Sequence, residues 1–364
     1  MKDIHFHIME PYALVAPERF GMPTLENARC LAESLDRFGL DMANIPAISL
    51  YEPEDFVCNP LALYAKTLAP GRIYALAGLK YTLHDTAEEI LQQAKQLMAA
   101  GFDGFKMICK PNARRVMKVR MDDPQFDLFF AEAERQQWPI LYHVGDPAEF
   151  WDPQKAPSWC KANGWYYGDE PDLPSYEQLY EEVEGFMQKH PLLRVTFAHF
   201  FFLAWEMERL GEFLDRYPNM RVDVTPGREM YVDFSSHPEE TRAFFSKYKG
   251  RLMLGTDNDA RNGDNRIAAE KAGAAKLERL RGFYETDGLT EWGAEKLRGI
   301  KLPVDVLHAL YEEAFDAFMG GRTPHIVSRE KAKALCRQLR PTAAASARWR
   351  SELEALYKAL EAAF

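Results

Sequence analysis

Residues 2–8 read Lys-Asp-Ile-His-Phe-His-Ile, and this short stretch bears on both the fold and the site. Its apolar and polar residues predict a first β-strand over residues 3–7. Side chains two positions apart in a strand point to the same face, so His5 and His7 project together. If the strand belongs to a barrel, that face is the interior, where two unpartnered imidazoles would be costly to bury. A shared cation would remove this cost, and two hydrogen-bonded core histidines are the alternative.

The composition describes a chain that can bury a substantial core. It has 364 residues, of which 47% are hydrophobic, and a formal net charge of −10. This charge argues against nucleic acid as the partner, and no apolar run is long enough to span a bilayer. Five widely spaced cysteines without a Cys-x-x-Cys pair indicate reduced thiols. Because the first residues do not resemble a signal peptide, we expect a cytoplasmic protein. A homodimer or higher homo-oligomer is the default expectation for its assembly.

Short β-rich runs alternate with amphipathic stretches through the first 260 residues. Eight strands are expected, at residues 3–7, 42–50, 73–79, 104–108, 140–143, 194–199, 220–225 and 251–256. The helices expected between them include residues 86–100, 123–136, 176–189 and 204–216. This alternation predicts parallel strands joined by crossovers, and eight units favour an α/β fold of the (β/α)8 TIM-barrel type. The Gly-x-Gly-x-x-Gly fingerprint of a dinucleotide-binding sheet is absent.

Two segments exceed a minimal barrel. Residues 144–175, after the fifth strand, form a long loop rich in aromatic residues. Loops of this length are often lids, and a packed excursion without a ligand is the alternative. Beyond residue 257 the chain becomes mostly helical and ends in an alanine-rich amphipathic helix over residues 343–364. We therefore predict a barrel over residues 1–325 and a helical C-terminal extension over residues 326–364, packed on the barrel or on a second subunit.

Residues with metal-binding or acid–base side chains fall near the carboxyl ends of the predicted strands. They are His5, His7, Lys106, His143, His199 and Asp257. The carboxyl ends of barrel strands converge on one face, where active sites lie. The remaining histidines, His84, His190, His237, His308 and His325, fall in expected loops or helices. This segregation predicts a metal site at the carboxyl face of the barrel.

Six short motifs occur in order along the chain. They are His-Phe-His at 5–7, Gly-Phe-Asp-Gly-Phe-Lys at 101–106, Pro-Ile-Leu-Tyr-His at 139–143, Phe-Ala-His at 197–199, Tyr-Pro-Asn-Met-Arg-Val-Asp at 217–223 and Leu-Gly-Thr-Asp at 254–257. As an ordered set they resemble the amidohydrolase superfamily. The resemblance is to the branch that contains hydrolases, lactonases, hydratases and metal-dependent decarboxylases.

By that resemblance, four residues would hold a divalent metal: His5, His7, His143 and Asp257. Imidazoles and a carboxylate suit Zn²⁺, which is the favoured ion, and a catalytic site leaves a position open for water. One ion is favoured over two. His199 would bind a second metal or face the substrate's oxygen. Lys106 would bridge two metals if carboxylated, and otherwise would pair with a substrate carboxylate or support the site structurally.

The function that the resemblance implies is a metal-dependent hydrolase that uses a metal-activated water on an amide, ester or lactone. Asp257 would take the water's proton, and His199 would polarise the scissile carbonyl. A non-oxidative decarboxylase or hydratase on the same scaffold is the alternative, because these ligands do not separate the reactions. A non-catalytic barrel is the third hypothesis, and the full set of ligand residues counts against it.

The segment after the fourth strand indicates the charge of the substrate. Residues 106–120 carry six cations and no acid, namely Lys106, Lys110, Arg114, Arg115, Lys118 and Arg120. If this segment rims the site, it would attract a small, carboxylated anion, and a solvated basic loop is the alternative. Arg228, after the seventh strand, would clamp a carboxylate with two hydrogen bonds. Asp146 and Asp223 would orient histidine ligands or serve as caps or barrel residues.

Overall fold

The computed structural model of the chain describes residues 1–9, 23–48, 58–261, 263–293, 295–343 and 347–363. Within these ranges, the side chains of Arg228, Asp264 and residues 342–349 are not described. Eight strands of the described chain form one parallel sheet, in this order: β1 (Lys2–Asp3), β3 (Met42–Pro46), β4 (Ile73–Gly78), β5 (Gly104–Ile108), β6 (Ile140–His143), β7 (Val195–Phe197), β8 (Met220–Asp223) and β9 (Leu252–Met253).

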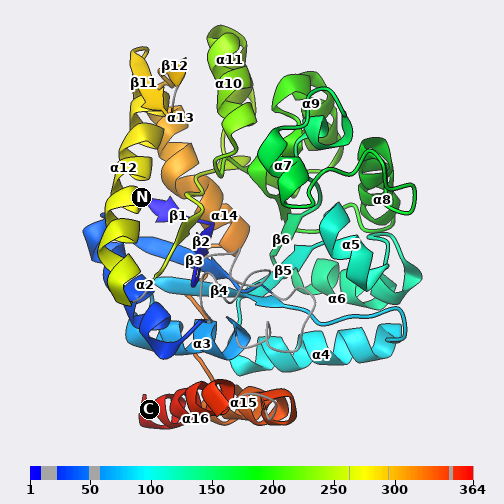
Figure 1. Cartoon of the computed structure of the whole chain (residues 1–364), viewed down its shortest axis with the longest axis vertical. Helices are drawn as coiled ribbons and strands as arrows, with labels where there is room; N and C mark the ends of the chain where they lie inside the picture. Colours follow the sequence, from blue (N-terminus) through cyan, green and yellow to red (C-terminus); the bar gives the residue numbers. More distant parts are fainter. Residues whose placement is uncertain (10–22, 49–57, 262, 294, 344–346, 364) are drawn as a thin grey trace.

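The sheet curves into a barrel because its first and last strands meet. The Ile4 N–H donates to the Leu254 carbonyl at 3.0 Å. Directly after these residues, β2 (Phe6–His7) pairs in parallel with β10 (Asn258–Asp259). Helices lie between consecutive strands and surround the barrel (Figure 1). The predicted TIM barrel is therefore confirmed.

Some predicted strands are longer than the observed ones. The first is interrupted because the His5 N–H donates to the Asp3 carboxylate at 2.9 Å, so a side chain replaces the neighbouring strand as acceptor. The sixth ends at Phe197 because the backbone turns sharply from His199 onward. The second ends at Pro46, and positions 49 and 50 of its predicted range lie outside the described residues.

The helices cover the outer face of the barrel and its N-terminal end. Their bounds are α2 (Leu25–Arg37), α3 (Cys58–Leu68), α4 (Ala87–Ala100), α5 (Pro111–Met117), α6 (Asp127–Gln136), α7 (Ser158–Ala162), α8 (Tyr176–Lys189), α9 (Met207–Arg216), α10 (Arg228–Ser236), α11 (Pro238–Lys247), α12 (Arg266–Glu285), α13 (Val304–His308), α14 (Ala314–Met319), α15 (Arg329–Ala343) and α16 (Ala347–Ala362). A small antiparallel pair, β11 (Leu289–Trp292) and β12 (Glu295–Arg298), follows α12. None of these described helices combines the length and apolar character that crossing a bilayer requires.

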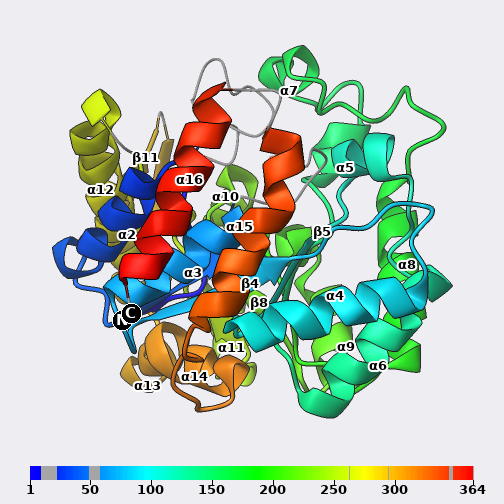
Figure 2. The same ribbon diagram turned by 90° about the horizontal axis from the view of Figure 1, so that it is seen from below.

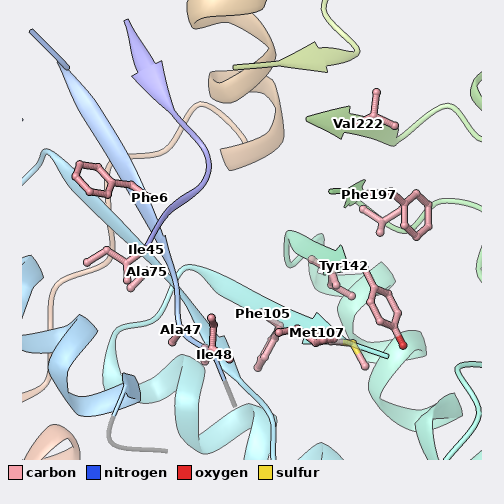
Figure 3. Close-up of a cluster of buried hydrophobic side chains, with 14 of the residues drawn as sticks. Phe6, Ile45, Ala47, Ile48, Ala75, Phe105, Met107, Tyr142, Phe197 and Val222 are labelled. Carbon is pink, nitrogen blue, oxygen red and sulfur yellow. The ribbon is translucent and has the colours of Figure 1, made fainter. Parts of the chain in front are cut away.

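Alternation along the strands separates an outer core from an inner one. Figure 3 shows part of the outer core, where Phe105, Tyr142 and Phe197 project from neighbouring strands. Leu141, one position before Tyr142, belongs instead to a second buried cluster, which also contains Phe315 of α14. Apolar side chains of α14 pack into the amino-terminal end of the barrel. Polar side chains occupy the inward positions nearer the carboxyl ends of the strands.

The C-terminal helices α15 and α16 pack against each other as a hairpin. They contact α3 and α4 on the outside of the barrel (Figure 2). Between the two helices, Lys333 Nζ donates to Glu361 Oε1 at 2.9 Å. The chain therefore ends in a helical layer that lies on the barrel helices, and the division into two domains at residue 325 stays a prediction.

Candidate metal centre and active site

A pocket of about 520 Å³ opens at the carboxyl ends of the barrel strands. Its lining includes all six residues singled out at the predicted strand ends: His5, His7, Lys106, His143, His199 and Asp257. Gly227, which also lines the pocket, directly precedes Arg228 at the start of α10. The Arg228 side chain lies outside the described part of the structure, so its carboxylate clamp stays a prediction.

Three of the predicted metal ligands gather on one side of the pocket. His5, His7 and Asp257 each offer one ligand atom, and these atoms lie within 4.8 Å of one another. The closest pair is His7 Nε2 and Asp257 Oδ1, at 3.1 Å, and His5 Nε2 lies 4.0 Å from the same oxygen. Two imidazoles and a carboxylate in this arrangement can hold a divalent cation and leave coordination positions open.

The backbone holds these ligands together because hydrogen bonds connect the ends of the first and last strands next to them. The Asp257 N–H donates to the His5 carbonyl at 2.9 Å. The buried Asp3 carboxylate accepts from the N–H groups of His5 and Thr256, at 2.9 and 3.0 Å. Asp257 itself has a φ of 52°, which few residues other than glycine adopt freely. Asp3 was not singled out from the sequence, although an acid two residues before a buried histidine was a possible signal.

Asp223 fixes the orientation of His5. Its Oδ2 lies 3.0 Å from His5 Nδ1, and its Oδ1 accepts from the His199 N–H at 2.7 Å. Burial alone would raise the pKa of Asp223, but these hydrogen bonds and the facing histidines lower it to about 2. The carboxylate is therefore ionised and accepts a hydrogen bond from the Nδ1–H of His5, so His5 presents the Nε2 lone pair to the pocket.

Lys106 lies against that same lone pair. Its Nζ is 3.4 Å from His5 Nε2, deep in the pocket. Burial lowers the pKa of Lys106 to about 8, so an appreciable neutral fraction exists near physiological pH. A cation on His5 Nε2 and a hydrogen bond from Lys106 to the same atom exclude each other.

His143, the last residue of β6, lies apart from these three ligands. His143 Nε2 lies 2.9 Å from the Gly145 carbonyl, which can only accept, so Nε2 carries the proton and Nδ1 is the free acceptor. The ring packs against His199 with centroids 4.8 Å apart. Burial lowers the pKa of His143 to about 3, which keeps the ring neutral. Its role as a fourth metal ligand stays a prediction.

His199 begins an unusual backbone turn. His199, Phe200, Phe201 and Phe202 all have φ between 55° and 59°, a conformation that costs a residue with a Cβ about 1–2 kcal/mol. The His199 Nδ1 lies 3.3 Å from the Thr225 carbonyl, so Nδ1 carries the proton and Nε2 is the acceptor. Burial lowers the pKa of His199 and favours this neutral form.

The long loop after β6 lines the other side of the pocket. Phe150, Trp159 and Trp165 contribute aromatic lining. Tyr167 Oη donates to Asp146 Oδ2 at 2.7 Å. Lys110 joins these parts, because its Nζ lies 3.3 Å from Asp146 Oδ1 and 4.1 Å from the centre of the Trp165 ring. The loop therefore contacts Lys110 at the rim through Asp146 and Trp165, and its motion as a lid stays a prediction.

The predicted basic segment is divided between the pocket and other surfaces. Of its six cations, Lys106 and Lys110 line the pocket. Three others form ion pairs: Arg114 with the buried Glu182, Arg115 with Glu170 and Arg120 with Asp122. Lys118 is exposed and directly follows the last residue of α5. Two of the six cations of this segment are therefore placed to contact a bound anion.

Acidic side chains also line the pocket, and the sequence motifs did not point to all of them. Glu229, in the first turn of α10, lies near Glu149 and Asp146, and burial raises its pKa to about 7. Lys276 of α12 reaches back to donate to the Asp257 carbonyl at 2.8 Å. The position of Glu229 soon after β8 was an available signal, whereas Lys276 lies far from any strand end.

Comparisons with known proteins agree with this architecture. A family model described as "Amidohydrolase" matches residues 3–258. An uncharacterized TIM-barrel protein from Bordetella bronchiseptica superposes with a TM-score of 0.51 at 12% identity, covering 88% of this chain and 100% of that one. A putative amidohydrolase from Staphylococcus aureus gives the same values. These two identities are low, so the structural likeness concerns the fold alone. No curated protein matches in sequence.

Proposed function

The chain belongs to the amidohydrolase family, and from that premise we propose that it is a metal-dependent hydrolase. Its substrate would be an amide, ester or lactone of a small, carboxylated molecule. The observation that carries the proposal is the convergence of His5, His7 and Asp257 in one pocket, although Asp257 lies about 250 positions from the two histidines in the sequence. A divalent cation, with Zn²⁺ favoured, would be held by these three side chains.

The donor atoms present fit such an ion. His5 donates its Nδ1–H to the Asp223 carboxylate and directs Nε2 into the pocket, which is the pattern of a histidine that a carboxylate orients toward a metal. His7 has a buried Nδ1 without a hydrogen-bond partner in the described structure, and its Nε2 faces Asp257. When bound, the cation supplies Lewis-acid chemistry, which makes water nucleophilic at neutral pH.

The protein's own residues then divide the proton transfers. The facing imidazoles hold the pKa of Asp257 well below its usual range even though burial opposes this, so Asp257 is a carboxylate that can accept the proton of the attacking water. His199 presents Nε2 as an acceptor. His199 would take up that proton from Asp257 and then donate it to the leaving group, so that the proton of the attacking water ends on the product.

The rest of the pocket would bind the substrate. Lys106 and Lys110 are placed to pair with a carboxylate. The aromatic residues Phe150, Trp159 and Trp165 would contact its organic part and exclude water from the reacting atoms. These contacts favour a small molecule over a polymer.

Metal removal provides the test. The protein is stripped with a chelator and reloaded with Zn²⁺, and acid release is measured from a panel of lactones, esters and amides. We expect turnover to be lost on stripping and restored on reloading. His7→Ala should lose both retained metal and turnover, whereas His84→Ala, at an exposed loop position, should keep both.

Two results would overturn the proposal. Acid release that is equally fast in the stripped protein would remove the metal from the mechanism. Release of CO₂ from carboxylic acids, without acid release from the panel, would instead identify a decarboxylase on the same scaffold.

A further inference from the structure

Two tyrosines of α8 contact the backbone turn that carries His199. Tyr176 Oη donates to the Phe202 carbonyl at 2.7 Å. Tyr180 Oη lies 2.9 Å from the Phe201 carbonyl and 2.8 Å from Tyr176 Oη. The two hydroxyl groups are therefore hydrogen-bonded to each other and to the last two carbonyls of the turn.

The turn needs such support because its sequence does not favour its shape. Residues 199–202 read His-Phe-Phe-Phe, and all four have positive φ. A glycine would adopt this conformation freely, but a residue with a Cβ does so only when its surroundings impose it. Aromatic packing provides part of that constraint, since the Phe201 ring stacks on Phe197 with centroids 4.2 Å apart and meets Tyr180 edge-on at 4.9 Å.

The shape of the turn decides where the His199 ring lies. His199 is its first residue, and its N–H is held by Asp223 at 2.7 Å. With the N–H fixed on one side and the carbonyls of Phe201 and Phe202 fixed on the other, the ring is directed beside His5 and His143, at centroid distances of 5.5 and 4.8 Å. Releasing the carbonyls would allow the turn to relax toward negative φ and would change the direction of the imidazole.

We propose that Tyr176 and Tyr180 are positioning residues, whose hydroxyls set the orientation of the His199 imidazole in the pocket. Neither phenol contacts the reacting groups. They act through the backbone of the turn. The consequence for turnover rests on the proposed function, whereas the orientation of the ring can be measured without any substrate.

The test removes one or both hydroxyls and keeps the rings, with Tyr176→Phe, Tyr180→Phe and the double variant. The chain has nine histidines, so long-range ¹H–¹⁵N spectra of the metal-free, ¹⁵N-histidine-labelled protein can resolve each ring, with His199→Asn used to assign the signal. We expect the His199 signals to move or broaden in the double variant while those of the exposed His84 and His308 stay in place.

Activity provides a second readout on the Zn²⁺-loaded enzyme. The double variant should lose about tenfold in kcat, with KM and bound metal within about twofold of wild type, because a displaced group costs rate more than binding. Tyr248→Phe is the matched control. It removes the buried hydroxyl that donates to the Gly211 carbonyl at 3.1 Å, away from the pocket, and should leave the His199 signals and kcat unchanged.

Unchanged His199 signals in the double variant would overturn the proposal. If the double variant does not fold, the single variants are judged by the same criterion. If wild type turns over no compound of the panel, the proposed function fails, but the spectra still decide the positioning role. If kcat falls equally in Tyr248→Phe, the effect is general loss of stability and the positioning role is rejected.

Discussion

The two sides of the pocket are built differently. On the side of His5, His7 and Asp257, the backbone that carries the ligands is held by hydrogen bonds to Asp3 and by hydrogen bonds between the first and last strands. On the opposite side, His143 Nε2 donates a hydrogen bond to the Gly145 carbonyl of the loop at 2.9 Å. The nearby Asp146 is held by a tyrosine of the long loop. The first side belongs to the barrel, and the second depends on the loop.

This difference separates two tasks. A metal site needs ligands fixed before the ion arrives, and closely packed strands provide this at no further cost in conformational freedom. Substrate recognition can use a less rigid wall, since aromatic loop residues can adjust around different organic groups. We therefore expect changes on the first side to affect metal affinity, and changes in the loop of the second side to affect turnover at constant metal content.

The largest effect is expected at Asp223, beneath the first side. In Asp223→Asn an amide N–H₂ would face His5 Nδ1, so the ring would have to carry its proton on Nε2 and lose the lone pair that faces the pocket. We expect Zn²⁺ affinity to fall about 10- to 100-fold, measured by competition with a coloured chelator.

A matched buried acid controls for lost stability. Asp103→Asn removes a carboxylate at the opposite end of the barrel, where it pairs with Lys66 at 2.6 Å. That variant should unfold more easily but bind Zn²⁺ as wild type does. Equal loss of affinity in both variants would contradict the view that Asp223 acts through His5.

The sequence was sufficient to predict the residues of the first side, because their placement follows from strand geometry. A His-x-His pair in a strand must share one face, and the end of the last strand of a barrel must lie beside the first. These two rules place His5, His7 and Asp257 together before any coordinate is known. The same rules place Lys106, His143 and His199 in the lining of the same pocket.

The second side could not be predicted at this level, because its contacts depend on loop conformation. Nothing in the sequence indicates that His143 Nε2 meets the Gly145 carbonyl. Charge alone likewise suggested a basic rim, whereas Arg114 turns away to a buried glutamate. Three consecutive phenylalanines also gave no sign of a left-handed turn, since their propensity favours extended backbone and tertiary packing overrides it.

An intermediate effect is expected at Lys106, between the two sides. Burial lowers its pKa from 10.5 to about 8, so below pH 8 the folded metal-free protein holds a charge that the unfolded chain solvates better. This cost disappears as pH rises from 8 through 10.5, where the unfolded lysine also loses its proton. Lys106→Met should therefore stabilise the metal-free protein at pH 7 by about 3 kcal/mol, and the gain should shrink toward pH 10.

Urea unfolding of both proteins across this pH range measures the difference, because other titrations cancel between them. Lys66→Met is the contrasting control, since Lys66 pairs directly with Asp103 and its removal leaves a buried acid without its cation. That variant should be destabilised at neutral pH. A stability gain for Lys106→Met that does not change with pH would contradict the titration argument.

The smallest effect is expected at Tyr167, on the loop side. Tyr167→Phe removes the hydrogen bond to Asp146 at 2.7 Å and keeps the buried ring, so the loop should stay folded while Asp146 and its neighbour Lys110 lose a fixed position. We expect kcat/KM to fall about five- to tenfold, equivalent to about 1 kcal/mol, with Zn²⁺ content unchanged. Tyr166→Phe is the matched control, because that hydroxyl bonds to the exposed Asp169 at 3.1 Å. Loss of bound Zn²⁺ in Tyr167→Phe would mean that the loop also supports the metal ligands, and the division between the two sides would be wrong.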